Sequence, residues 1–560
     1  MAKRYFFIFA ILLLISFGTI RPLLNNGIFP MHDDTQVGRV IVMGKALRNG
    51  QFPVRWVSDL GYGYGYPLFN YYGPLPYYVG GFLYALGVPP LESIKAMMGI
   101  GFILSGITMF MLARSRFDTA GGFISAILYM YAPYHAVQGY VRGSVGELWA
   151  YAFLPLVAWG ILNLLDDAKR RGTILVGGIG LAGIILSHTI FGYVVTGVGL
   201  IFGLFYGGAY MFVKRYFVWQ PMLDFGLLMG IGLSLSAFFW LPAAFEMSAT
   251  SVSGQVGPTA NFRDHFVCLF QLWNAPWGFG GSTQGCVDGM SFKIGKIHLI
   301  LAAASLIVWF LKRKTYLSLQ SYMIGGIMIS MISIFFMLQT SQIFWELIPN
   351  AAFVQYPWRL LMVANLGISM IAAALVVVSH NRLLRTAIAG TVCVLVTLVN
   401  AKWFAPQYMI ERPLYSYESE EELRYRVSKI SDEYLPSDFI RPQKAADVPH
   451  EVLSASSLYK ADIEVDTETY VKALLTSNED TEVTIQRIYF PGWNYQVNGK
   501  SIVPKIRNSL PTIAIPSGES VLEINFYNTP IRIVGNLISI ISLASLVILY
   551  GTKKTSSSIA

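Results

Sequence analysis

Apolar segments long enough to cross a lipid bilayer recur along almost the whole chain, and they limit the folds open to it. A bilayer core takes about 20 apolar residues in a helix. In lipid the backbone polar groups must pair within the chain, so repeated segments of this kind predict a helical bundle. About twelve segments fit: residues 4–20, 92–113, 119–135, 148–165, 173–189, 190–213, 222–242, 296–311, 321–338, 359–379, 386–401 and 532–550. The sequence therefore predicts an α-helical polytopic membrane protein.

The distribution of charge supports this class and excludes nucleic-acid binding. Only 13% of the residues are charged, against about a quarter in soluble proteins. The net charge of +9 does not form a basic stripe, because the Lys and Arg residues fall in small clusters between the apolar segments. This pattern is typical of membrane topology.

Loop charge also predicts an orientation. If the N-terminus is cytoplasmic, every basic cluster lies on the cytoplasmic side, as positively charged loops usually do. The clusters are Arg114/Arg116, Lys169-Arg170-Arg171, Lys214-Arg215, Lys312-Arg313-Lys314, Arg382/Arg385 and Lys553-Lys554. The first apolar segment lacks a small-residue cleavage pattern, which favours an uncleaved span over a signal peptide. We expect a multi-pass protein of the plasma membrane with both termini in the cytoplasm.

Three ranges describe the predicted organisation. Residues 1–401 form the membrane domain, which includes a long first extracytoplasmic loop at 21–91. Residues 402–531 form an extracytoplasmic domain whose short alternating segments predict strands, with Asn498-Gly499 as a hairpin turn and Pro516-Ser517-Gly518 as another. Residues 532–560 give the last span and a short cytoplasmic tail. The apolar stretch at 75–88 is rich in Pro, Gly and Tyr, and we interpret it as an interfacial or re-entrant helix.

The three cysteines exclude a disulfide-rich fold and a zinc site. Cys393 lies in an apolar run and is interpreted as a small core residue. Cys268 and Cys286 share one loop that is predicted to be extracytoplasmic, where a disulfide persists. Spacing alone does not decide whether the two are bridged.

The loop after the first span carries the strongest candidate for chemistry, His32-Asp33-Asp34. Paired carboxylates beside a membrane are either well solvated or functional. The functional interpretation is a general base, or a ligand for a divalent cation such as Mg or Mn, supplied by Asp33 or Asp34. We expect one aspartate to act and the other to support it, with His32 orienting the carboxylate.

Two further groups of residues favour binding. A segment of alternating glycine and tyrosine, with Tyr64, Tyr66, Asn70 and Tyr71, offers flat faces with polar edges that suit a sugar or a prenyl-phosphate headgroup. An aromatic belt at the membrane surface explains the same residues. The remaining candidates are Arg142, Glu147 and Arg359: the arginines suit a phosphate, and a structural ion pair with Glu147 is the alternative.

These motifs resemble known membrane proteins over nearly the whole chain. The first-loop carboxylates, the re-entrant helix and the C-terminal extracytoplasmic domain resemble the GT-C superfamily of membrane glycosyltransferases. More narrowly, the chain is similar to a family described as 6-pyruvoyl-tetrahydropterin synthase-related, and its C-terminal part to YfhO-like membrane proteins. The segments that carry this similarity are HDDTQVGR, GYGYPLFNYYGPLPYY, YAPYHAVQGYVRGSVGE, QYPWR, YFPGWNYQVNGK and IPSGESVLEINFYNTPIRIVG.

The GT-C resemblance implies an activity, whereas the pterin label does not, because the seven histidines are scattered. It implies transfer of a hexose or pentose from a polyprenyl-phosphate donor to a glycan, lipid or protein acceptor of the cell envelope. The catalytic carboxylate of that superfamily corresponds to Asp33 or Asp34. Some relatives use a metal held by a D-x-D pair, and the adjacent aspartates here depart from that pattern. The alternative function is a non-enzymatic transporter of lipid-linked saccharide or a cell-envelope assembly factor.

Overall fold

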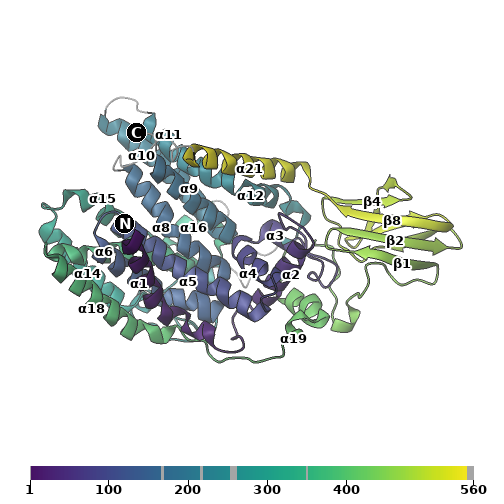
Figure 1. Ribbon diagram of the computed structural model, residues 1–560, viewed down its shortest axis with the longest axis horizontal. Coiled ribbons are helices and arrows are strands. Elements are labelled where there is room, and N and C mark those ends of the chain that lie inside the picture. Colours follow the sequence, from purple (N-terminus) through teal and green to yellow (C-terminus); the bar gives the residue numbers. More distant parts are fainter. Residues whose placement is uncertain (1, 166–169, 215–218, 253–260, 349–350, 552–560) are drawn as a thin grey trace. The chain divides into compact units, whose positions relative to one another are not determined.

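The computed structural model describes residues 2–165, 170–214, 219–252, 261–348 and 351–551, and helices dominate it (Figure 1). Each of the twelve predicted segments overlaps one or more consecutive helices. The helices that make up most of these segments are α1 (Ala2–Ile20), α5 (Pro90–Arg114), α6 (Thr119–Met130), α8 (Val145–Leu165), α9 (Arg170–Ser187), α10 (Thr189–Lys214), α11 (Gln220–Leu235), α12 (Ala237–Phe245), α14 (Lys296–Lys312), α15 (Gln320–Met337), α17 (Leu361–Ala372), α18 (Arg382–Asn400) and α21 (Pro530–Gly551). The other α-helices are α2 (Gln36–Arg48), α3 (Leu68–Tyr71), α4 (Leu75–Ala85), α7 (Pro133–Ala136), α13 (Leu269–Trp273), α16 (Gln342–Leu347), α19 (Tyr415–Glu418) and α20 (Ser428–Ile430).

Length and apolar character identify fewer spans than the sequence predicted. Within the described residues, seven helices are long and apolar enough to cross a membrane, or eight if one bent pair is a single span. Three further apolar helices are shorter. The chain is thus a polytopic helical membrane protein, and the number of twelve spans is not confirmed. The side of each terminus stays a prediction, and Lys169, Arg215 and the tail at 552–560 lie outside the described residues.

The bent pair replaces a segment that the sequence predicted as one span, 222–242. The segment is divided at Ser236 into helices α11 and α12. The first N–H groups of a helix have no partner within it, and the Phe238 N–H instead donates to the Ser539 hydroxyl of α21 at 2.9 Å. This bond supports the start of a new helix, α12, which packs along α21 (Figure 1).

The chain divides into two compact units that interleave along the sequence. The helical unit comprises Met1–Asp33, Lys95–Ser234 and Val256–Glu411. The β-containing unit comprises Asp34–Ile94, Leu235–Gln255 and Arg412–Ala560. The units differ from the three consecutive ranges predicted from the sequence, because most of the first loop packs with the C-terminal strands.

Close helix contacts in the helical unit depend on small residues. Helices α8 and α9 pack along each other, and a Cβ at Gly160 would lie 2.6 Å from the Cα of Gly177. Helices α15 and α17 approach in the same way at Gly326 and Gly367. Small residues at such positions let helix backbones come together, which is how helices associate in lipid.

The β-containing unit holds two antiparallel sheets (Figure 1). One sheet has the order β1-β2-β8-β4-β5 and the other β3-β7-β6. The strands are β1 (Tyr459–Asp466), β2 (Tyr470–Ser477), β3 (Thr481–Thr484), β4 (Trp493–Val497), β5 (Lys500–Ile502), β6 (Lys505–Arg507), β7 (Leu510–Ile515) and β8 (Gly518–Phe526). The predicted hairpin turn at Asn498-Gly499 is confirmed, with φ of 51° and 75°. The prediction of a second hairpin turn at residues 516–518 is wrong, because β7 pairs with β3 and β6 rather than with β8, and the turn joins strands of different sheets.

The first loop contributes two packed helices and a buried tryptophan to this unit. Helix α4, in the stretch expected to be interfacial or re-entrant, has 11 residues and packs on α2. The indole of Trp56 is fully buried, and its ring centroid lies 5.3 Å from that of Trp493 and 5.7 Å from that of Phe526. The first loop and the strands therefore share one apolar core.

Candidate functional site

A sharp turn brings two of the predicted charged residues together. Arg142 ends a short π-helical turn, η2 (Val137–Arg142), and Glu147 lies in the first turn of α8. Gly143 between them has φ +62°, and a Cβ there would overlap Met31. Glycine meets both requirements, since it adopts positive φ without strain. The turn reverses the chain, so that the two side chains meet across it.

The Glu147 carboxylate is the centre of a buried polar group that we call the Glu147 cluster. Arg142 donates to both of its oxygens, at 2.5 and 2.9 Å. Arg359, from the short turn η10 (Pro357–Leu360), forms an ion pair with Glu147 at 3.0 Å. Tyr134 donates its hydroxyl to the carboxylate at 3.2 Å, and His188 Nε2 lies 3.8 Å from Glu147 Oε1.

The Glu147 cluster holds an excess of positive charge. Two guanidinium groups face one carboxylate, which is fully buried. Burial alone would lower the pKa of Arg142, but the negative charge of the Glu147 carboxylate holds this pKa above its ordinary value. The Asp33 carboxylate acts in the same direction with a smaller effect. The guanidinium of Arg142 also lies over the Trp358 ring, 4.6 Å from its centroid. Arg142 is thus charged and fully engaged by the protein.

Arg359 is engaged less completely than Arg142. Its Nη1 donates to the Val354 carbonyl at 2.8 Å, and its Nε faces Glu147. Among the described residues, none accepts a hydrogen bond from Nη2. A guanidinium nitrogen of this kind can donate to a phosphate oxygen. Both arginines thus form the ion pair with Glu147 that was named as the alternative, and a phosphate role for either of them stays a prediction.

Asp33 lies beside this cluster. Its backbone N–H donates to the Arg142 carbonyl at 2.9 Å, and the N–H of His32 donates to the Val141 carbonyl at 3.2 Å. The Asp33 side chain is half-buried, and His32 Nε2 is 3.0 Å from the Phe279 carbonyl. The imidazole of His32 thus has a backbone partner in another loop.

Asp34 belongs to the β-containing unit, although it follows Asp33 directly. Partial desolvation, and then the charge of Glu422, raises the pKa of its exposed side chain, while Arg412 and Arg426 oppose this. Within the described part of the chain, no group of three or more His, Cys, Asp or Glu side chains is arranged to hold a metal ion. The role of a divalent cation stays a prediction.

The glycine–tyrosine segment is engaged inside the β-containing unit. Asn70 donates to the Glu246 carboxylate at 2.9 Å, and Tyr71 donates to the Glu246 carbonyl at 2.6 Å. The Tyr66 hydroxyl accepts the Tyr434 N–H at 3.0 Å. The Tyr64 ring packs edge-on against Phe439. These contacts account for the residues structurally, and ligand binding by them stays a prediction.

The sequence interpretation missed the charged centre of this second network. Arg532 of α21 donates to Glu246 at 2.9 and 3.0 Å and is fully buried. Arg55 joins through Asn70, to which it donates at 3.0 Å. Lone ionisable residues at the ends of apolar segments, such as Arg532 and Glu246, are the signal that would have revealed it.

We expect Gly65→Ala to destabilise the protein by about 1–3 kcal/mol from overpacking alone. Gly65 has φ +84°, and a Cβ would overlap the buried Trp56 indole. Gly50→Ala is the matched control, since Gly50 has φ +76° with nothing within 4 Å of the added Cβ. Thermal unfolding in detergent should show a larger decrease in Tm for Gly65→Ala than for Gly50→Ala, which carries the backbone strain alone. Equal losses in the two variants would assign the effect to backbone strain and not to the tryptophan.

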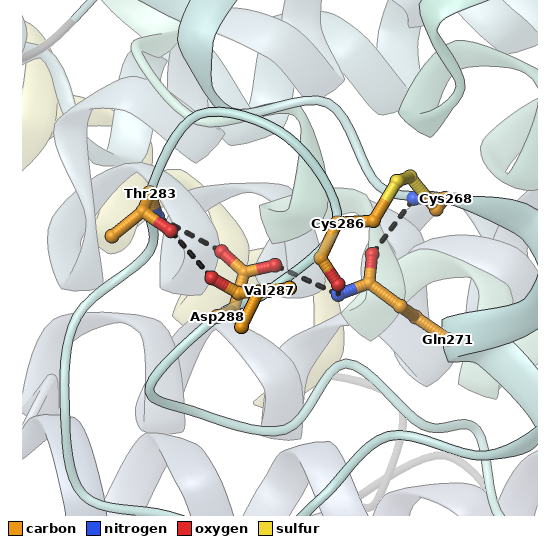
Figure 2. Close-up of a disulfide and its surroundings, with 6 residues drawn as sticks. All are labelled: Cys268, Gln271, Thr283, Cys286, Val287 and Asp288. Carbon is orange, nitrogen blue, oxygen red and sulfur yellow. Dashed lines mark hydrogen bonds between the residues drawn. A yellow bond between two sulfur atoms is a disulfide. The ribbon is translucent and has the colours of Figure 1, made fainter.

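Cys268 and Cys286 form a disulfide, with their Cα atoms 5.6 Å apart (Figure 2). Gln271 donates to the Cys286 carbonyl at 3.2 Å and to Asp288 at 2.7 Å. Figure 2 shows the Asp288 carboxylate between Gln271 and Thr283, whose N–H donates to it at 2.9 Å. The loop closed by this disulfide includes Phe279, the partner of His32.

Removal of this disulfide is expected to destabilise the protein. The two cysteines are 18 residues apart, and closing a loop of this length stabilises a fold by about 3 kcal/mol. A Cys268→Ser/Cys286→Ser variant and the reduced wild-type protein should therefore show similar decreases in apparent Tm. The Cys393→Ser variant is the control and should keep the sensitivity to reductant. A wild-type Tm unaffected by full reduction would contradict the prediction.

Comparisons with known proteins place these observations in context. No protein-family model and no curated protein matches the chain. Part of the chain resembles the arabinofuranosyltransferase AftD from Mycobacteria, with 15% identity, 75% of this chain, 28% of that chain and a TM-score of 0.44. It also resembles the oligosaccharyltransferase AglB from Archaeoglobus fulgidus in complex with an inhibitory peptide and a dolichol-phosphate. The sequence identity is 14%, the match covers 79% of this chain and 62% of that chain, and the TM-score is 0.46. A third similar structure is ArnT from Cupriavidus metallidurans bound to undecaprenyl phosphate. The sequence identity is 12%, the match covers 77% of this chain and 78% of that chain, and the TM-score is 0.36.

These structural similarities are limited in the share of the matched proteins that they cover and in their TM-scores. The chain spans less than two thirds of AftD and of AglB. Each TM-score lies below 0.5, so none establishes a shared fold or an activity, and the two narrower family resemblances stay predictions. What the chain itself establishes is a polytopic helical membrane protein whose helical unit places Asp33 beside a buried Arg–Glu–Arg cluster.

Proposed function

We propose that the protein is a GT-C-type glycosyltransferase that moves a sugar from a polyprenyl-phosphate donor to an acceptor on the extracytoplasmic face. The observation that carries the proposal is the hydrogen bond between the Asp33 N–H and the Arg142 carbonyl, at 2.9 Å. It holds the backbone of Asp33 next to Arg142, and the half-buried Asp33 carboxylate acts on the charge of that arginine. The resemblance of the sequence motifs to membrane glycosyltransferases gives independent support.

In this proposal Asp33 is the general base. A carboxylate within hydrogen-bond reach of an acceptor hydroxyl takes its proton as the oxygen attacks the anomeric carbon of the sugar. The new glycosidic bond forms as the bond to the lipid phosphate breaks, and the attack inverts the anomeric configuration. We favour Asp33 over Asp34 because the charge of Asp33 acts on Arg142, whereas the charges that act on Asp34 are those of Glu422, Arg412 and Arg426.

Arg359 stabilises the leaving group in this mechanism. The departing lipid phosphate gains negative charge, and a guanidinium fixed in a desolvated site offsets it. The Nη2 of Arg359 is the available donor, whereas Arg142 is held by both oxygens of Glu147. Glu147 is then a positioning residue that keeps two like charges together. No step of the mechanism requires a metal ion.

The test is transfer of a labelled sugar by the purified protein from polyprenyl-phosphate donors to extracts of cell-envelope glycan, lipid and protein. We expect product that depends on both the protein and the lipid phosphate, with the inverted anomeric configuration. Movement of intact lipid-linked saccharide across proteoliposomes, without transfer, would overturn the proposal and support a transporter. A retained configuration would exclude the single-displacement mechanism.

A further inference from the structure

Three lysines gather where α14 begins and α18 ends. Lys293 and Lys296 lie at the start of α14, and Lys402 follows α18 in the short turn η12 (Ala401–Trp403). In the described part of the chain, no carboxylate lies within ion-pair distance of any of them. These lysines are therefore a positive group without a negative partner.

Indole rings surround the lysines in place of carboxylates. The Lys293 ammonium lies 3.5 Å from the centroid of the Trp403 ring and 5.5 Å from that of Trp277. Lys402 lies 4.7 Å from the Trp403 ring. The two indoles are themselves 4.9 Å apart. Ring faces attract cations, but they do not neutralise them.

A fourth lysine–tryptophan pair extends the group, since Lys296 lies 5.7 Å from the centroid of the Trp273 ring. Desolvation, and then repulsion by Lys402 and Lys296, lowers the pKa of Lys293 to about 8. The protein thus holds three like charges close enough to oppose one another. A bound anion would relieve this repulsion, and the half-exposed rings leave the site open to one.

The predicted topology gives the anion a source. Basic clusters mark the cytoplasmic side, and these three lysines lie at the opposite ends of their helices, where few Lys or Arg residues occur. Tryptophan is enriched at the depth of lipid headgroups, and Trp273 is 47% exposed. Cations beside exposed indoles at this depth match a headgroup that carries a negative charge above an acyl chain.

We propose that Lys293, Lys296 and Lys402, with Trp273, Trp277 and Trp403, bind the phosphate headgroup of an anionic phospholipid in the extracytoplasmic leaflet. The lysines would hold the phosphate, and the indoles would lie against the glycerol backbone. The site does not depend on the proposed sugar transfer.

Native mass spectrometry of the detergent-solubilised full chain tests this site. The probes are phosphatidylglycerol and phosphatidylcholine with identical acyl chains. We expect the wild-type protein to bind phosphatidylglycerol at least tenfold more tightly. The Lys293→Gln/Lys296→Gln/Lys402→Gln variant should lose this preference, and the corresponding triple arginine variant should keep it. Lys500→Gln, an exposed lysine of β5, is the control and should bind as the wild type.

Three outcomes would overturn the proposal. The first is equal wild-type affinity for the two lipids, a result that needs no variant to fold. The second is an undiminished preference in the triple glutamine variant. The third is displacement of phosphatidylglycerol by millimolar inorganic phosphate, which would assign the site to a free anion.

Discussion

Asp33→Asn is expected to lower kcat for sugar transfer by about two to four orders of magnitude, the usual contribution of a general base. Asparagine keeps the size of the side chain and the backbone hydrogen bond to Arg142, but it cannot accept the proton of the acceptor hydroxyl. The KM for the lipid donor should change little, because the carboxylate acts on the acceptor. Initial rates at saturating donor, with the variant shown to be folded by its Tm, measure the effect.

Asp34→Asn is the matched control, since it makes the same change one residue later. Its side chain is exposed and lies in the other unit, so we expect less than a tenfold decrease in kcat. The reverse result, with Asp34 essential and Asp33 dispensable, would move the base to Asp34. Wild-type activity in both variants would sink the proposed mechanism.

Glu147→Gln is expected to give the largest loss of stability in the helical unit. The substitution removes the buried carboxylate that pairs with both Arg142 and Arg359, and breaking a buried ion pair costs about 3–5 kcal/mol. Activity should fall as well, because Arg359 loses its ion pair at 3.0 Å. Apparent Tm in detergent, read from intrinsic tryptophan fluorescence, measures the stability change.

Two comparisons separate this effect from a general loss of charge. Glu346→Gln removes a carboxylate from an exposed ion pair with Arg263, and solvent screening should leave its Tm close to the wild type. Adding Arg359→Gln to Glu147→Gln removes one of the stranded charges and should restore part of the lost Tm. If Glu147→Gln and Glu346→Gln had equal effects, the buried cluster would not stabilise the fold.

The sequence predicted the local structure of this protein well. Runs of apolar residues overlap helices throughout, because a backbone in lipid has few alternatives to the helix. The Asn498-Gly499 pair predicted a hairpin, since both residues accept the positive φ that the turn requires. The bend at Ser236 could not be read in this way, because it depends on a hydrogen bond from Phe238 to Ser539 in a distant helix.

For the candidate site too, some features were predicted from the sequence and others were shown only by the structure. His32, Asp33, Arg142, Glu147 and Arg359 were named from residue type and from their place at the ends of spans. The sequence left open whether the arginines pair with Glu147 or with a phosphate, because an arginine beside apolar neighbours suits both equally well. The structure decides this for Arg142, which donates to both oxygens of Glu147.

By itself, the sequence determined that the chain is a helical membrane protein, and it named candidate residues for the chemistry. Hydrophobic length and residue type are local properties, and these conclusions need nothing else. Only the tertiary structure decided that the first loop packs with the C-terminal strands and that the two adjacent aspartates have different surroundings. Those outcomes depend on contacts between segments far apart in the chain, such as Asn70 with Glu246, 176 residues away, which chain order does not encode.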